Sequence, residues 1–206
     1  MKISIEITQE KHYCYSQEIC DTIEKSAQLR GTGIAKRTPE YIQKKMELGD
    51  AIIALDKGKF VGFCYIESWQ HGKFVAHSGL IVHPDYRNLG LAKEIKSKVF
   101  DYSLKKYPDA KIFGITTGLA VMKINSDLGY KPVPFSELTS DPSFWSGCKT
   151  CANFEILKSK ENKMCLCTGM LYDANEKPTV VQKHPFNLKV FNRLKSIKQA
   201  LFLKKQ

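Results

Sequence analysis

Residues 80–92 have the sequence LIVHPDYRNLGLA, in which an apolar strand pattern meets a helical one. The strand-like run ends at Val82, a proline turn follows, and the small residues Gly90 and Ala92 begin a long helical stripe. Free amides at the start of a helix bind anions, and small residues let a phosphate approach the backbone. With Arg87 as an added cation, the stretch predicts a phosphate or pyrophosphate site. The alternative is an ordinary turn between a strand and a helix.

The patterns on either side of this stretch predict a mixed α/β sheet with helices on it. Alternating apolar residues and short glycine-containing turns indicate an antiparallel meander before it, and helical stripes alternate with short strands after it. The expected elements are strand 2–8, helices 16–29 and 40–48, strands 51–56, 60–69 and 74–82, helix 90–107, strand 112–116, helix 120–128 and strand 131–135.

The last third of the chain is expected to form an extension, residues 136–206, packed on a domain of residues 1–135. A short helix around Trp145 begins it. A cysteine-rich hairpin is predicted over 148–172, and apolar residues at helical spacing predict a basic amphipathic helix over 187–203.

The chain has 206 residues, a formal net charge of +11 and 43% hydrophobic residues. This composition suits a globular domain and excludes disorder, collagen and a disulfide knot. No apolar run reaches the roughly 18 residues of a membrane span, and the strand-like start is not typical of a signal peptide, so we expect a cytoplasmic protein without a membrane partner. No acidic residue follows Glu176, whereas eight lysines and arginines do. That excess suits an anionic partner or a solvated helix face.

The motif Arg87-Asn88-Leu89-Gly90-Leu91-Ala92 resembles the acetyl-CoA loop of the GNAT superfamily of N-acetyltransferases, whose pattern is Gln/Arg-x-x-Gly-x-Gly/Ala. The order of expected elements from residue 1 to about 135 is similar to that family as well, including a helix that ends in Leu128-Gly129-Tyr130. The resemblance implies a GNAT fold and an enzyme that uses acetyl-CoA.

The resemblance also implies roles for matching residues. The backbone of Leu80, Ile81 and Val82 would pair with the pantetheine arm, and the six-residue motif would hold the pyrophosphate. The strand from Ile112 would splay away from strand 74–82 and admit the thioester. An amine would then attack the acetyl carbonyl directly, with a base to deprotonate it and an acid for the leaving thiolate.

Candidates for the acid and the base follow from this mechanism. Many relatives place a tyrosine acid where this chain has Asn125, which can donate a hydrogen bond but no proton; Tyr130 and Ser126 are nearby alternatives. Glu67 is the first candidate for the base, because burial beside apolar neighbours would raise its pKa; otherwise it faces solvent at a strand end. His77 is the second candidate for the base; the alternative is a buried core histidine whose hydrogen bonds are satisfied.

The segment between the first two helices borders the acceptor site in this fold. It carries the cations Arg30, Lys36 and Arg37 and no acidic residue. Guanidinium groups suit carboxylates, so a small acidic amine acceptor such as glutamate is expected; contact with cofactor phosphates or water is the alternative. A bacterial GNAT subgroup associated with arginine biosynthesis, N-acetylglutamate synthase-like, is similar over nearly the whole chain. The runs that carry this likeness are RGTGIAKRTPEYI, GFCYIESW, PDAKIFGITTGLAVMKINSDLGYKPV, GCKTC, CLCTGMLYD and LKVFNRLKSIK.

Four of the seven cysteines form two close pairs, Cys148 with Cys151 and Cys165 with Cys167. A Cys-x2-Cys pair can hold one metal, and Cys-x-Cys on a strand places both sulfurs on one face. Four thiolates suit a structural zinc ion. Free thiols and a redox disulfide are the alternatives.

The favoured function is acetyl transfer from acetyl-CoA to the primary amine of a small acidic acceptor. A protein amine or another amine is the alternative acceptor, and a non-catalytic module that binds CoA or nucleic acid is the non-enzymatic alternative. No base-reading motif is present, so we do not expect a nucleic-acid partner. The apolar stripe of the C-terminal helix makes a homodimer a further expectation.

Overall fold

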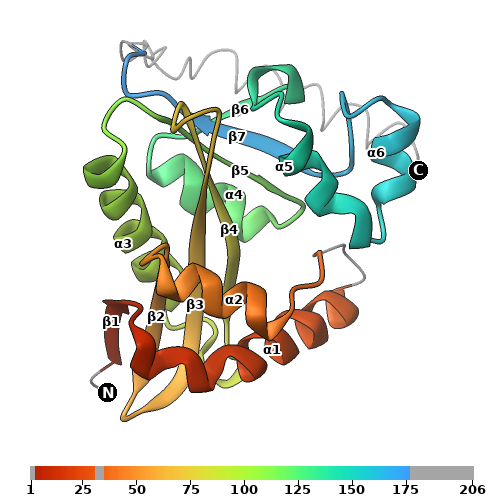
Figure 1. Ribbon diagram of the computed structural model, residues 1–206. Helices are drawn as coiled ribbons and strands as arrows, with labels where there is room; N and C mark the ends of the chain where they lie inside the picture. The colour runs from red at the N-terminus through yellow and green to blue at the C-terminus, as the bar shows by residue number, and fades with distance from the viewer. Residues whose placement is uncertain (1–2, 31–34, 177–206) are drawn as a thin grey trace, which may run out of the picture. The chain divides into compact units, whose positions relative to one another are not determined.

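A mixed sheet organises the computed structural model, which describes residues 3–30 and 35–176. Within these residues seven strands lie in the spatial order β1-β2-β3-β4-β5-β7-β6 (Figure 1). β4 and β5 run parallel, and every other neighbouring pair is antiparallel. The strands are β1 (Ile3–Ile7), β2 (Ala51–Asp56), β3 (Lys59–Trp69), β4 (Phe74–Val82), β5 (Lys111–Thr116), β6 (Lys131–Val133) and β7 (Thr168–Tyr172).

Helices connect these strands where the sequence predicts them up to residue 133. The α-helices are α1 (Ser16–Arg30), α2 (Pro39–Glu47), α3 (Leu91–Lys106), α4 (Leu119–Asp127), α5 (Pro142–Ser146) and α6 (Phe154–Ser159). Short 3-10 helices are η1 (Glu10–Tyr15), η2 (Pro84–Tyr86), η3 (Phe135–Glu137) and η4 (Gly147–Thr150). Thr38 caps the start of α2, because its Oγ1 accepts the amide of Tyr41 at 3.3 Å, and Pro39 takes the first helical position.

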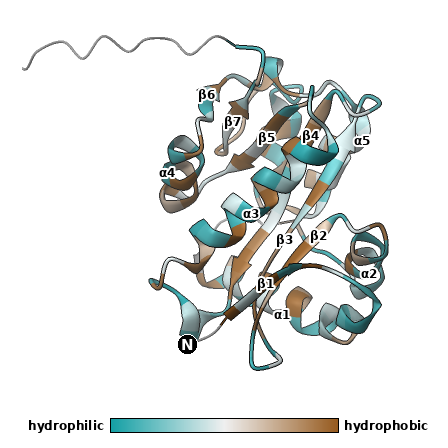
Figure 2. Cartoon of the chain, turned by 90° about the vertical axis from the view of Figure 1, so that its left-hand side faces the viewer, coloured by the Kyte–Doolittle hydropathy of each residue, from teal (hydrophilic) through white to brown (hydrophobic). Residues whose placement is uncertain are grey.

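Both faces of the sheet are covered, because the central strands are apolar on both sides. α1 and α2 pack on one face, where Ile19 and Ile42 meet Phe63. α3 packs on the other face, where Ile95 and Val99 join the core. Figure 2 shows the hydrophobic residues concentrated along the strands, with hydrophilic residues on much of the helix surface.

The hairpin predicted over 148–172 is wrong. Residues 154–159 form α6, because Phe154 and Leu157 lie three apart and pack inward together, while Ile156 between them is exposed. Only 168–172 form a strand, and β7 pairs antiparallel with both β5 and β6.

The boundary expected at residue 135 therefore falls inside the sheet, and the compact unit that contains the sheet runs to Asn175. The basic helix predicted over 187–203, and with it the expected dimer contact, lies outside the described residues. None of the helices in residues 3–30 and 35–176 has both the length and the apolar content that a bilayer crossing requires.

Candidate active site

β4 and β5 diverge after a short stretch of parallel pairing. Residues 74–76 pair with residues 111–113, whereas β4 continues to Val82 beyond that pairing. Gly79 follows this point with a φ of +65°, and a Cβ there would lie 2.5 Å from the ring of Tyr65. Only glycine fits such a position without a shift of the ring. The splay expected between the two strands is confirmed, and it leaves one edge of β4 open.

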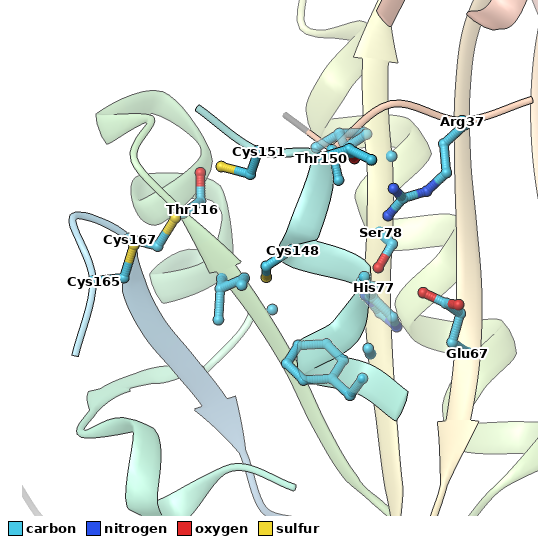
Figure 3. A pocket seen from close by; sticks show the side chains of 18 of the residues that line it. Arg37, Glu67, His77, Ser78, Thr116, Cys148, Thr150, Cys151, Cys165 and Cys167 are labelled. Atoms are coloured by element: carbon cyan, nitrogen blue, oxygen red, sulfur yellow. The ribbon is translucent and has the colours of Figure 1, made fainter. Parts of the chain in front are cut away.

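A cavity of about 570 Å³ occupies this gap and continues past β3 to α2 (Figure 3). It brings together half of the residues that the sequence singles out, although they come from separate elements, and residues 87–92 do not line it. Ile81, Val82 and Tyr130 do not line it, because their side chains are buried in the core. The predicted residues that line the cavity are Lys36, Arg37, Glu67, His77, Leu80, Asn125, Cys148, Cys151, Cys165 and Cys167.

The start of α3 presents free backbone amides. Gly90 has a φ of +83° and Asn88 a φ of 64°, and a Cβ at Gly90 would meet no atom within 4 Å. The amides of residues 88–92 have no acceptor among the residues that the structure describes. Arg87 lies beside them, but its guanidinium donates to Ser26 Oγ at 2.9 Å and to the carbonyl of Val82 at 3.3 Å. The amides rather than Arg87 are thus the unused donors of the loop.

At the α2 end of the cavity, a carboxylate and a guanidinium lie on the same wall (Figure 3). Arg37 Nε donates to the hydroxyl of Tyr65 at 2.6 Å, and the guanidinium lies over the Tyr41 ring at 5.5 Å. Glu67 is 12% exposed, and its Oε1 accepts the hydroxyl of Tyr41 and lies 3.5 Å from Lys45 Nζ. Burial raises the pKa of Tyr65 to about 12, so its hydroxyl stays neutral.

The three predicted acceptor cations have different surroundings. Lys36 pairs with Glu24 at 2.7 Å on the surface, with side chains 68% and 45% exposed. The backbone amide of Lys36 donates to Thr150 Oγ1 at 2.9 Å, which links the segment before α2 to η4. The side chain of Arg30 lies outside the described residues. Arg37 is therefore the strongest candidate for binding a carboxylate.

A lysine that the sequence reading missed lies in the floor of the cavity. Lys96, on α3, is 2% exposed, and its Nζ lies 2.9 Å from His77 Nδ1. The hydroxyl of Tyr130 lies 3.0 Å from the same nitrogen, and His77 Nε2 lies 2.8 Å from Ser103 Oγ. The sequence does indicate that Lys96 is buried, because it lies four residues before Phe100 and seven before Ser103 and so shares the buried side of α3 with them.

The pKa values of this cluster reflect its burial. Burial, and then the charge of Lys96, hold the pKa of His77 well below its ordinary value. Burial lowers the pKa of Lys96 to about 8, and it raises the pKa of Tyr130 well above its ordinary value. His77 is therefore neutral at neutral pH, and its contacts are those of a buried core residue.

Asn125 is 1% exposed and lies in the cavity wall at the end of α4. Its backbone carbonyl accepts the amides of Leu128 and Tyr130 at 3.0 Å each. Its side-chain Oδ1 is buried and has no hydrogen-bond partner among the described residues. A buried polar atom without a partner is costly, which suggests that a ligand satisfies it.

The four paired cysteines share one wall of the cavity, but they do not fit a structural zinc ion. Asn153 joins the two pairs, since its amide donates to Cys151 Sγ at 3.4 Å and its carbonyl lies 3.8 Å from Cys165 Sγ. In the described part of the chain, no three His, Cys, Asp or Glu side chains converge on a metal position. Burial, and then the neighbouring thiols, raise the pKa of Cys148 to about 11 and that of Cys167 to about 12. The thiols of Cys148 and Cys167 are therefore protonated, and none of the four cysteines forms a disulfide.

Comparisons with known proteins agree with this geometry. Residues 22–117 match the sequence model of the Acetyltransferase (GNAT) family. The N-acetylglutamate synthase of Neisseria gonorrhoeae, solved with coenzyme A and N-acetyl-glutamate, superposes with a TM-score of 0.61 at 12% identity over 85% of this chain and 36% of that one. This chain thus spans about a third of that protein's length.

Two other solved structures match over nearly their whole length. Rv2747 from Mycobacterium tuberculosis, in complex with CoA and NLQ, gives a TM-score of 0.60 at 12% identity, covering 82% of this chain and 98% of that one. The putative acetyltransferase yncA from Salmonella typhimurium, with acetyl-CoA, gives 0.58 at 15% identity, covering 87% and 98%. A search among curated proteins gave no significant match. Residues 22–117 are thus similar in sequence to the GNAT family of acetyltransferases, and the chain shares the fold of these solved structures.

Proposed function

We propose that the protein transfers the acetyl group of acetyl-CoA to the amine of a small acidic amino acid, with glutamate favoured, as an N-acetylglutamate synthase of arginine biosynthesis does. One observation carries the proposal. A single cavity joins the gap between β4 and β5 to a wall that holds both Arg37 and Glu67. Below, the donor end means this gap and the start of α3, and the acceptor end means Arg37, Tyr41, Tyr65 and Glu67.

The donor end suits the cofactor part by part. The free amides of residues 88–92 would hold the pyrophosphate at the start of α3. The open edge of β4 offers backbone groups to the amides of the pantetheine arm, in the manner of an added strand. The thioester would then reach the inner end of the gap, where Asn125 supplies an unsatisfied side-chain oxygen.

The acceptor end suits an amino acid. Arg37 is held by Tyr65 and Tyr41 in one orientation, and a fixed guanidinium binds a carboxylate at low entropic cost. Glu67 lies on the same wall, and both of its contacts involve Oε1. Among the described residues Oε2 has no partner, so it can accept a proton from an amine.

The chemistry follows from these positions. Glu67 takes a proton from the acceptor ammonium, and the free amine attacks the acetyl carbonyl. A C–N bond forms, the nitrogen loses its second proton to solvent, the C–S bond breaks, and the thiolate of CoA leaves with the electron pair. Positioning of the two substrates and general-base catalysis each contribute to the rate.

An acceptor panel tests the proposal. The full chain is incubated with acetyl-CoA and with glutamate, glutamine, aspartate, putrescine or a lysine peptide, and acetylated products are quantified by mass spectrometry. Product detection is preferred to a thiol reagent because the chain itself carries seven free thiols. We expect glutamate to give the highest kcat/KM. Preference for the peptide or for putrescine would overturn the acidic acceptor, and no product with any amine would overturn the proposed reaction.

A further inference from the structure

Lys96 is a buried amine for which the fold supplies no counter-charge. Its side chain is 2% exposed, and no carboxylate of the described residues lies in ion-pair contact with it. The contacts of Nζ are His77 Nδ1 at 2.9 Å and the ring of Tyr130, 5.1 Å from its centroid. A buried ammonium without an anionic partner is costly, and an apolar side chain would fill the same space more cheaply. The placement of Lys96 therefore indicates a functional role and not a contribution to core packing.

The hydrogen bonds around His77 determine which of its ring nitrogens carries the proton. Ser103 Oγ donates its hydrogen to the carbonyl of Val99 at 2.8 Å, so it can only accept from His77 Nε2. His77 is therefore the Nε2–H tautomer, and Nδ1 is an acceptor that faces Lys96 and Tyr130. One N–H of Lys96 points to Nδ1, and the other hydrogens of the ammonium are available to the cavity that Lys96 lines.

The location of Lys96 coincides with the inner end of the donor gap. His77 belongs to β4 just beyond its last pairing with β5, and a Cβ at Gly114 of β5 would lie 3.4 Å from the His77 carbonyl. Asn125 lines the same cavity from α4. A pantetheine arm that runs along the gap from the start of α3 ends here with its sulfur.

We propose that Lys96 is the acid that protonates the leaving thiolate of CoA, the role that Asn125 cannot fill. As the C–S bond breaks, the electron pair goes to sulfur, and an N–H proton of the Lys96 ammonium moves to it. Free CoA leaves as a thiol, and neutral Lys96 regains a proton from solvent. The acceptor ammonium loses two protons as it becomes an amide: the first goes to Glu67, which releases it to solvent, and the second leaves the new C–N nitrogen to solvent. With one proton returned to Lys96, the net products are the amide, CoA thiol and one proton, so charge and atoms balance. His77 and Tyr130 are positioning residues, because they hold Nζ. This inference rests on the proposed acetyl-CoA reaction.

The titration of the cluster agrees with this role. Burial lowers the pKa of Lys96 to about 8, close to the ordinary thiol pKa of about 8.5, and matched values favour proton transfer. The titratable groups that face Lys96 are His77 from β4, Tyr130 after α4 and Cys64 from β3. Burial raises the pKa of Cys64 to about 11, so Lys96 titrates before it.

The first test is the substitution Lys96→Met, with Lys98→Met on the exposed side of the same helix as the matched control. Tyr130 can still donate to His77 Nδ1 at 3.0 Å, so we expect the variant to fold, which circular dichroism checks. For Lys96→Met we expect kcat to fall ~100-fold, with the KM for acetyl-CoA within about twofold. In the wild type kcat falls as the pH rises through about 8, and this limb disappears in the variant. A kcat of Lys96→Met equal to that of the wild type would overturn the proposal. So would a fall in kcat near pH 8 that persists in the variant.

The second test needs neither an acceptor nor a variant. The thiol of bound CoA is titrated by its thiolate absorbance, with desulfo-CoA bound to the protein as the baseline. A nearby ammonium lowers the pKa of a thiol, so we expect a value below that of free CoA in the wild type and no lowering in Lys96→Met. An unshifted or raised value in the wild type would overturn the role of Lys96. Failure of CoA to bind would instead overturn the proposed donor site.

Discussion

The proposed donor end is built mainly from backbone, whereas the proposed acceptor end is built from side chains of α2, β3 and the segment before α2. The proposed donor end offers the free amides of residues 88–92 and the edge of β4, and its requirements are conformational, as at Gly79 and Gly90. The acceptor end uses charges held by neighbours, as Arg37 is held by Tyr65. In the proposed function, backbone groups contact features that every CoA shares, whereas the side chains that contact the acceptor can be changed by substitution.

The largest effect is expected at the acceptor end, for Glu67→Gln. The amide still accepts the Tyr41 hydroxyl but cannot take a proton, so we expect kcat to fall ~100-fold with little change in the KM for acetyl-CoA. Steady-state kinetics with saturating glutamate measures this. A kcat within threefold of the wild type would remove Glu67 from the mechanism.

Arg37→Gln tests whether the acceptor end binds a carboxylate. A charged hydrogen bond contributes about 1.5–3 kcal/mol, so we expect the KM for glutamate to rise about 30-fold while that for acetyl-CoA stays constant. Lys44→Gln on α2 is the control, because Lys44 pairs with Glu47 on the surface, with side chains 61% and 58% exposed. An equal rise in the KM of both substrates would show a loss of structure instead of a loss of recognition.

Gly90→Ala tests the donor end through its backbone. An alanine at a φ of +83° is strained by about 1 kcal/mol, and relief of that strain moves the amides at the start of α3. We expect the KM for acetyl-CoA to rise about fivefold, with the KM for glutamate unchanged.

Gly58→Ala is the matched control for that change. Gly58 has a φ of +80° and equal open space, but it lies in the turn between β2 and β3. Both variants should lose similar thermal stability, measured by calorimetry. If Gly58→Ala raised the KM for acetyl-CoA equally, the effect at Gly90 would not report on the cofactor.

The smallest effect is expected where the two ends meet, at Asn125. Loss of one hydrogen bond to the cofactor in Asn125→Ala should lower kcat/KM about threefold, because a neutral hydrogen bond contributes about 1 kcal/mol. Steady-state kinetics with varied acetyl-CoA gives this ratio. Unchanged kinetics would show that the buried Oδ1 is not used.

The sequence locates the residues of the proposed donor end more directly than those of the proposed acceptor end, and the reason is physical. Gly90 and its neighbours are consecutive, so one motif describes them. Arg37 and Glu67 are held by partners such as Tyr65 and Lys45 on separate elements, and only the folded sheet shows these contacts. Lys96 was missed because one polar residue on a helix stripe is compatible with an exposed face.

The same difference between consecutive residues and long-range contacts explains why the hairpin predicted beyond residue 136 is wrong. The run of residues 154–157 is too short for periodicity to separate strand from helix, and packing of Phe154 and Leu157 decided it. The position of β7 depends on pairing with β5, more than fifty residues earlier, which no local pattern encodes.

The insertion of β7 between β5 and β6 has a consequence for synthesis. The chain makes β5 and β6 before β7, so on the ribosome these two strands are translated without the neighbour that joins them. Until residue 172 emerges, β5 presents an unpaired edge, which is a hazard for aggregation. The wall that carries Cys165 and Cys167 arrives at the same moment. The nascent protein therefore completes this cavity only after β7 has been translated, and chaperone contacts should concentrate on the interval between the synthesis of β5 and that of β7.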